Sequence, residues 1–301
     1  MTGDVAVGVS NAGTRQVATG ATAFRIASLT KACTSTALVL TMRERGIPLD
    51  TAVRELLADL DWRADPGITV EHLLGQVSGL RESVDAATAA ALGDGPDALT
   101  EAARLVAGAG NDRAPGTRWS YYNGNYFLAG AILAALHDAP FETAVRRTLL
   151  DPWHLSRTTF ETPGDAVTGW DGDTQLPHTA YPRARRPSGG LWSCVPDLLT
   201  FGERLIADDV LVKTIRGPRT RPDDPMTYGL GWAVGPHGQL YLNGRLPGYR
   251  AAMLLVPERE HVSVVLANQQ DALPAAARLL SDLQRPLTGD DLADAIDGFA
   301  A

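Results

Sequence analysis

The most regular hydrophobic pattern in the chain is a run of apolar and small residues from Ser28 to Arg45, without glycine or proline. Gly46 and Pro48 follow it, and such residues just past a periodic run are typical stop signals of a helix. The run is apolar or small almost all round, which is typical of a buried helix rather than a surface helix. We therefore predict a central buried helix over residues 28–45.

Short alternating runs near both ends of the chain predict strands. The first two strands are expected at Val5–Val9 and Gln16–Ala18, around a turn at Asn11-Ala12-Gly13. Later in the chain, four runs joined by turn-forming residues predict an antiparallel meander. These four runs are Gly231–Val234, Gln239–Asn243, Ala251–Val256 and Val262–Ala267.

The region between them is mostly helical in pattern, with a loop-like stretch over residues 165–186. The predicted helices are Thr69–Leu74, Pro96–Gly108, Asn125–Leu136, Asp197–Ile206 and Pro274–Leu283. This order predicts an α+β fold with an antiparallel sheet flanked by helices. Residues 1–50 together with 183–301 are expected to form the α/β lobe, and residues 51–182 a mostly helical lobe inserted into it.

Composition narrows the class of protein. The net charge of −8 and pI near 5.2 argue against a nucleic-acid partner, and no apolar run reaches the ~20 residues of a membrane span. The arginines at 183, 185 and 186 lie among prolines and predict a solvated loop. The start lacks the basic and apolar regions of a secretory signal, and two cysteines are too few for a disulfide framework. We expect a cytoplasmic protein.

The scarcity of lysine in the sequence points to candidate catalytic residues. Lys31 and Lys213 are the only lysines among 27 basic residues. Ser28 and Lys31 share one face at the head of the predicted buried helix, where free N–H groups and the helix dipole favour negative charge. Burial lowers the pKa of a lysine, so Lys31 would be able to accept the proton of Ser28. The pair predicts a serine nucleophile with a lysine base.

Other catalytic patterns are absent from the sequence. It contains no G-x-S-x-G, H-E-x-x-H, phosphate-loop or dinucleotide-binding pattern, and its six histidines lack metal-ligand spacing. A second candidate is the segment from Tyr121 to Asn123, just before a predicted helix. A tyrosine beside a lysine can act as a base or proton relay, and an asparagine amide can hold a carbonyl. The alternative for this segment is simple packing of aromatic residues onto the core.

Five segments in order resemble the class C β-lactamase, DD-peptidase and related esterase family. Residues 24–31 (FRIASLTK) are similar to the nucleophile segment, and residues 115–123 (PGTRWSYYN) to the segment that carries the second motif. The stretches 68–80, 189–197 and 228–232 are also similar. The resemblance spans about residues 5–280 and implies a β-lactamase/DD-peptidase-like fold with the active site in a cleft between the two lobes.

The resemblance also implies roles for individual residues. Ser28 would be the acylated nucleophile, Lys31 its base, and Tyr121 the group that protonates the leaving group and later activates water or another acceptor. Asn123 would bind the substrate carbonyl. The backbone N–H of Arg245 would complete the oxyanion hole with that of Ser28. The substrate implied is a small acyl compound, and no metal or organic cofactor is implied.

The sequence departs from the family where a Lys or His is usual in the third motif. There the segment Leu242-Asn243-Gly244 brings a leucine, which cannot attract a carboxylate, although Arg245 is adjacent. Gln76 also stands where a histidine is usual. We expect a serine esterase, amidase or acyltransferase rather than a true β-lactamase or D-Ala-D-Ala peptidase. A relative that has lost catalysis and binds a ligand or another protein remains the alternative, and the oligomeric state is left open.

Overall fold

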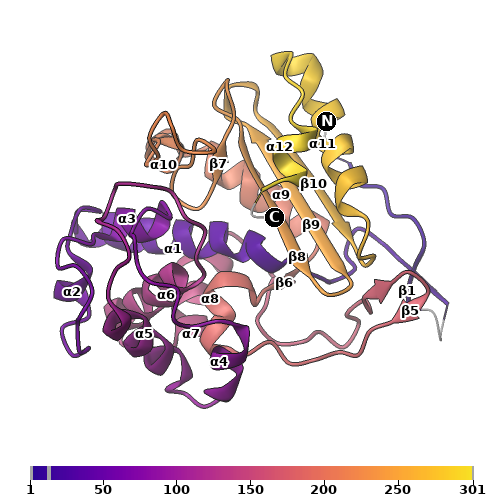
Figure 1. Ribbon diagram of the computed structural model, residues 1–301. Helices are drawn as coiled ribbons and strands as arrows, with labels where there is room; N and C mark the ends of the chain where they lie inside the picture. The colour runs from indigo at the N-terminus through magenta and orange to yellow at the C-terminus, as the bar shows by residue number, and fades with distance from the viewer. Residues whose placement is uncertain (1–2, 12–14, 300–301) are drawn as a thin grey trace.

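The computed structural model describes residues 3–11 and 15–299, and its centre is a four-stranded antiparallel sheet (Figure 1). The strand order is β10-β9-β8-β7. Helix α11 packs on one face of the sheet and α9 on the other. These elements are β7 (Ala233–Val234), β8 (Leu240–Leu246), β9 (Tyr249–Val256), β10 (His261–Ala267), α9 (Val195–Ile206) and α11 (Leu273–Thr288).

The second part of the molecule is helical and lies beside the sheet, with α1 (Thr30–Arg45) between the two (Figure 1). Helix α6 (Gly124–His137) packs against α1 and α5 and is buried along most of its length. The remaining helices of this part are α2 (Val53–Leu56), α3 (Val70–Leu74), α4 (Ala86–Ala91), α5 (Ala98–Ala109) and α7 (Phe141–Val145), followed by a π-helical turn η2 (Arg146–Leu150).

The remaining elements are short. They are β1 (Val9–Asn11) with β2 (Gln16–Val17), β3 (Phe24–Arg25) with β6 (Trp192–Ser193), β4 (Trp170–Asp171) with β5 (Thr174–Gln175), and the helical turns η1 (Ala27–Leu29), η3 (Arg183–Arg185), α8 (Arg186–Gly189), α10 (Asp209–Arg216), η4 (Pro257–Arg259) and α12 (Ala293–Asp297). None of the helices in the described residues is long and apolar enough to cross a membrane.

The predicted central helix forms, and twelve of the sixteen residues of α1 are buried. It ends at Gly46, which adopts a left-handed conformation (φ 64°), as the stop signal predicts. Its start differs from the expectation, because Ser28 lies in the preceding 3₁₀ turn η1 rather than in the α-helix. The four strands of the meander and the five predicted helices also form, with ends displaced by a few residues.

The first predicted strand is wrong. The structure has no strand over residues 5–8, and β1 covers only Val9–Asn11, paired with β2. Val5 and Val7 are 89% and 90% exposed. Alternation alone did not make a strand here, because no apolar surface or partner strand among the described residues covers these valines. The predicted turn residues Ala12 and Gly13 lie outside the described residues.

Candidate active site

Ser28 lies at the junction between strand β3 and helix α1, on the short turn η1. The preceding residue, Ala27, has a positive φ of 47°, a conformation that costs a residue with a side chain about 1–2 kcal/mol. The N–H of Ile26 donates to the carbonyl of Leu191, and the N–H of Leu29 to that of Ile26, so the turn is held on both sides. The strained turn presents Ser28, which is half-buried, to a cavity.

The Lys31 amine is the nearest basic group to Ser28. Its Nζ lies 3.3 Å from Ser28 Oγ and donates to the carbonyl oxygen of Ser188 at 2.7 Å. Lys31 is 1% exposed, and no carboxylate oxygen in the described part of the chain lies within 4.0 Å of it. Burial, and then the positive charge of Arg185, lower the pKa of Lys31 well below its ordinary value of 10.5. Lys31 therefore gives up its proton more readily than an exposed lysine, and a base for the serine hydroxyl needs this property.

Tyr121 contacts the same serine from the helical side of the site. Its Oη lies 2.8 Å from Ser28 Oγ, and Lys31 Nζ lies 4.7 Å from the centre of its ring. Burial is the largest influence on the Tyr121 phenol and raises its pKa, against smaller opposing effects that include the hydrogen bond to Ser28. The raised pKa favours the protonated phenol, the form that can donate a proton.

Gln76 holds the loop that carries Tyr121. Its carbonyl oxygen accepts from the N–H of Ser120 at 2.9 Å, and its side-chain oxygen accepts from the N–H of Tyr122 at 3.1 Å. The same side-chain oxygen accepts from the amide of Asn125. These contacts bracket Tyr121 on both sides in the sequence. The glutamine that replaces the usual histidine thus positions the second motif, a role that the sequence did not indicate.

Two cavities meet at this site. The smaller, about 170 Å³, is lined by Ser28, and the larger, about 410 Å³, lies beyond it and opens toward α4. Tyr121, Asn123 and Arg185 line both cavities. Asn123 is half-buried and makes no capping hydrogen bond to α6, although it occupies the position that precedes this helix. Its amide is therefore available to a ligand at the boundary of the cavities.

Strand β8 forms the opposite wall, but of the three residues predicted on it, Leu242, Gly244 and Arg245, only Arg245 lines the cavity at Ser28. Leu242 is 0% exposed and belongs to the core, and neither it nor Gly244 lines a cavity at Ser28. Asn243, which was not predicted, lines the cavity together with Arg245, because alternate residues of a strand point to opposite faces. Gly244 has a different function: a Cβ there would lie 2.3 Å from the carbonyl oxygen of Ile26, so only glycine lets β8 approach the turn η1.

A segment that the sequence did not mark, Ala293–Phe299, closes the site behind Tyr121. The side-chain amide of Asn243 donates to the carbonyl oxygens of Ile296 (2.6 Å), Asp297 (3.2 Å) and Phe299 (3.0 Å). Phe299 is fully buried and packs edge-on against the Tyr121 ring, with the ring centres 5.8 Å apart. This segment therefore fixes the far side of the Tyr121 ring.

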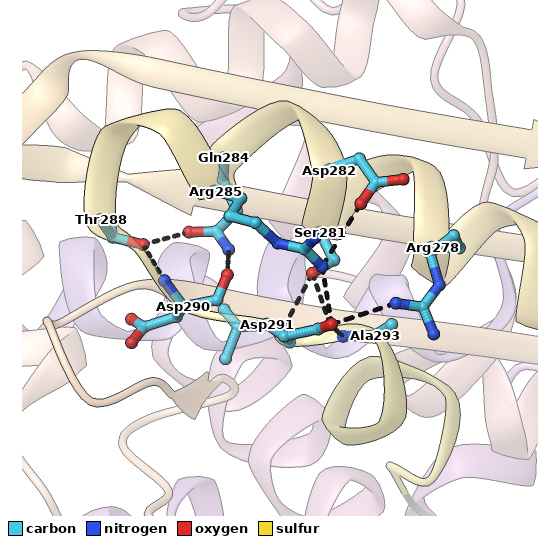
Figure 2. Close-up of polar contacts among 10 residues, drawn as sticks. Arg278, Ser281, Asp282, Gln284, Arg285, Thr288, Asp290, Asp291 and Ala293 are labelled. Atoms are coloured by element: carbon cyan, nitrogen blue, oxygen red, sulfur yellow. Dashed lines mark hydrogen bonds and ion pairs between the residues drawn. The ribbon is translucent and has the colours of Figure 1, made fainter.

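The turn between α11 and α12 is itself fixed by a polar cluster (Figure 2). Asp291 accepts hydrogen bonds from Arg278, from Arg285 and from the hydroxyl of Ser281, and it also accepts from the N–H of Ala293 at the start of α12. The α12 segment is thus anchored at its first residue by α11 and further along by Asn243.

The arginine-rich segment at 183–186 is not simply the solvated loop that was expected. Arg183 and Arg186 donate to the carboxylate of Glu142 at 2.9 and 2.7 Å and are partly buried, while Arg185 lines both cavities. Tyr181, another residue that the sequence did not indicate, lines the smaller cavity. These residues lie about 155 positions from Ser28 in the sequence, and no local pattern links them to it.

Within the described residues, no group of three or more His, Cys, Asp or Glu side chains is placed to hold a metal ion. The two cysteines are buried and unpaired, and burial raises the pKa of the Cys33 thiol to about 12 and that of Cys194 to about 11. Neither thiol is thus an alternative nucleophile.

Comparison with known proteins places this geometry in a family. The model of the family described as Beta-lactamase matches residues 2–284. "Protein flp" of Staphylococcus aureus (strain COL) is 24% identical over 271 residues, which cover 82% of this chain and 53% of that protein. The chain thus spans about half the length of this curated relative.

Solved structures agree on the fold. The octameric penicillin-binding protein homologue from Pyrococcus abyssi superposes with a TM-score of 0.78 at 23% identity, covering 95% of this chain and 70% of that one. EstCE1, a hydrolase with promiscuous acyltransferase activity, superposes with a TM-score of 0.70 at 19% identity, covering 88% and 84%. The chain belongs to the beta-lactamase family and has the β-lactamase/DD-peptidase fold, as the resemblance implied.

The lowered pKa of Lys31 predicts how kcat/KM depends on pH. The groups that face its amine are Ser28, the carbonyl of Ser188, the rings of Tyr121 and Tyr126, and the charge of Arg185. If Lys31 is the base, it must be neutral, so kcat/KM falls as the pH drops through its lowered pKa. We expect a plateau that already begins well below pH 10.5, measured with a neutral nitrophenyl ester. A rate that rises only near the ordinary lysine pKa would contradict the assignment.

Proposed function

We propose that this protein is a serine hydrolase or acyltransferase of the esterase or amidase type, which forms an acyl-enzyme on Ser28 from a small acyl substrate. The observation that carries the proposal is one cluster. Ser28 Oγ lies 2.8 Å from the Tyr121 hydroxyl and 3.3 Å from the buried amine of Lys31, at the edge of a cavity. The family membership and the hydrolase fold of EstCE1 support the proposal.

The proposed first half-reaction follows from the pKa directions. Neutral Lys31 takes the proton of Ser28 as its oxygen attacks the acyl carbon, and the carbonyl oxygen becomes an oxyanion. The N–H of Ser28, in the first turn of η1, lacks an acceptor in its own helix and is expected to stabilise the oxyanion together with the N–H of Arg245. Tyr121 then protonates the leaving alcohol or amine, and Lys31 returns the serine proton to Tyr121.

The second half-reaction reverses these transfers. Water or an acceptor alcohol or amine attacks the acyl carbon and gives its proton to Tyr121, which passes its own proton to neutral Lys31. Lys31 returns that proton to Ser28 Oγ as the bond between the acyl carbon and Ser28 breaks and the product leaves. The same site would serve hydrolysis and acyl transfer. The two reactions are distinguished by adding an alcohol and measuring whether the product is the free acid or the new ester.

The buried position of Leu242 predicts weak reaction with penicillins and cephalosporins. A lost charged hydrogen bond lowers rate or affinity about ten- to a hundredfold, because it is worth about 1.5–3 kcal/mol. We expect neutral activated esters to acylate Ser28 faster than penicillins, which carry their carboxylate on the leaving-group side. Intact-mass spectra recorded over time measure how fast the acyl-enzyme forms from the neutral ester and from the penicillin. Efficient cephalosporin hydrolysis would show that the third motif is assigned to the wrong strand position.

A fluorophosphonate probe tests the proposed function itself. It should add to one site, and the modified peptide should contain Ser28. Failure of labelling together with failure to hydrolyse any activated ester would support the alternative of a binding protein that has lost catalysis.

A further inference from the structure

Arg185 occupies the boundary between the two cavities of the site. It ends the helical turn η3, lines both the cavity at Ser28 and the larger cavity, and is half-buried. Its guanidinium carbon lies 5.3 Å from the centre of the Tyr181 ring, which supports the side chain from one side. A chain that extends from Ser28 past Asn123 into the larger cavity therefore passes Arg185.

The charge of Arg185 has no counter-charge in the part of the chain that the structure describes. Its neighbours Arg183 and Arg186 both pair with Glu142, but no carboxylate oxygen among the described residues lies within 4.0 Å of Arg185. A partly desolvated cation that faces a cavity is favourable when a ligand supplies the opposite charge. The guanidinium fork matches a carboxylate with two parallel hydrogen bonds.

Arg245, the other arginine of the smaller cavity, is less available. Its Nη2 donates to the carbonyl oxygen of Asp297 and lies 3.9 Å from the carboxylate of the same residue. Its Nε is buried without a hydrogen-bond partner among the described residues. The α12 segment therefore holds the Arg245 guanidinium, and Arg185 is the cation that a ligand can reach.

We propose that Arg185 binds a carboxylate on the acyl part of the substrate, so that the preferred substrates are esters or amides of short dicarboxylic acids. This inference rests on the function proposed above and names its substrate class. The position of Arg185 puts the carboxylate near the boundary of the cavities. Two exposed acidic residues, Glu82 and Asp85, line the larger cavity beyond it and disfavour a deeper anion.

The test compares three nitrophenyl esters by nitrophenolate release: the monoester of adipic acid, its methyl-capped neutral analogue, and a neutral acyl ester with a carboxylate on the nitrophenyl ring. In the wild type, kcat/KM should be about ten- to a hundredfold higher for the acyl-side carboxylate than for the capped ester. The ring carboxylate should give no such advantage, since it lies in the leaving group.

In Arg185→Gln the advantage should disappear, and in Arg185→Lys part of it should remain, because lysine keeps the charge but loses the fork. The readout is the ratio of two rates on one sample, so it does not depend on the fraction of folded protein. Arg183→Gln is the matched control: Arg183 lies in the same turn, pairs with Glu142 and lines neither cavity at Ser28, so this variant should keep the wild-type ratio.

Each outcome decides the inference. An active wild type without a preference for the acyl-side carboxylate, or a preference that survives Arg185→Gln, overturns it and leaves the proposed function standing. Loss of the preference in Arg183→Gln as well would assign the effect to the fold of the segment and also overturn it. A wild type that hydrolyses none of the esters and is not labelled at Ser28 contradicts the proposed function itself.

Discussion

Replacing Ser28 with alanine should lower kcat/KM for every acyl substrate by about a thousandfold or more. The substitution removes the oxygen that forms the acyl-enzyme, and no second nucleophile among the described residues is placed to replace it. Lys31 is 1% exposed and lines neither cavity, and the Tyr121 phenol is buried with a raised pKa. Steady-state rates with a nitrophenyl ester and intact-mass spectra after a fluorophosphonate probe measure the loss.

The fold of this variant should be unchanged, because the serine side chain is small and its strained turn is held by backbone hydrogen bonds. Thermal unfolding checks this point. Ser120→Ala is a suitable control, since Ser120 adjoins Tyr121 in the sequence but lines neither cavity at Ser28. The Ser120→Ala protein should still be labelled by the fluorophosphonate probe at Ser28. A Ser28→Ala protein that retains more than a few per cent of activity, or that is labelled on the same peptide, would remove Ser28 from the mechanism.

The sequence predicted the local structure around Ser28 well because the signals for it are local. The glycine-free run that ends at Gly46 predicts α1, and the three-residue spacing predicts that Ser28 and Lys31 meet, as they do at 3.3 Å. The contact between Ser28 and Tyr121 joins residues 93 positions apart. It was expected only through the family resemblance, since no periodicity indicates such a contact.

Other parts of the site depend on how distant segments pack, which no local pattern records. The prolines and arginines around Arg185 predict a solvated loop. In the structure Glu142, on α7, binds two of those arginines, and Arg185 lines the cavities. Phe299 follows an unremarkable stretch of the chain. Its position against Tyr121 depends on the anchors that Asn243 and Asp291 provide.

For strand β8, the sequence predicted the strand itself but not which of its residues face the site. Its existence follows from alternation, but which residues face the site depends on the register and on the adjacent elements. Gly244 meets the turn η1 and Leu242 enters the core, so Asn243 and Arg245 face the cavity. A shift of one residue along a strand exchanges its two faces, and the sequence alone did not fix that choice.

Replacing Lys31 with arginine should be nearly as damaging as replacing it with methionine, about a thousandfold or more in kcat/KM. Arginine keeps the positive charge but does not give up its proton at any accessible pH, so it cannot accept the proton of Ser28. If Lys31 served only as a fixed cation, Lys31→Arg would retain much of the rate. The comparison of the two variants thus separates a base from an electrostatic role.

Stability should move in the opposite direction to activity for Lys31→Met. The folded pKa of Lys31 is lowered, so between that pKa and the ordinary value of 10.5 the unfolded chain binds a proton that the folded chain releases, and this opposes folding. The cost is greatest below the folded pKa and vanishes as the pH rises through the ordinary value of 10.5. Methionine has a similar length and no such cost.

We therefore expect Lys31→Met to unfold at a higher temperature than the wild type at pH 7, with the difference shrinking toward pH 10.5. An inactive Lys31→Met that is also less stable at pH 7 would mean that Lys31 is charged and paired in the fold, and the lysine would then not be the base.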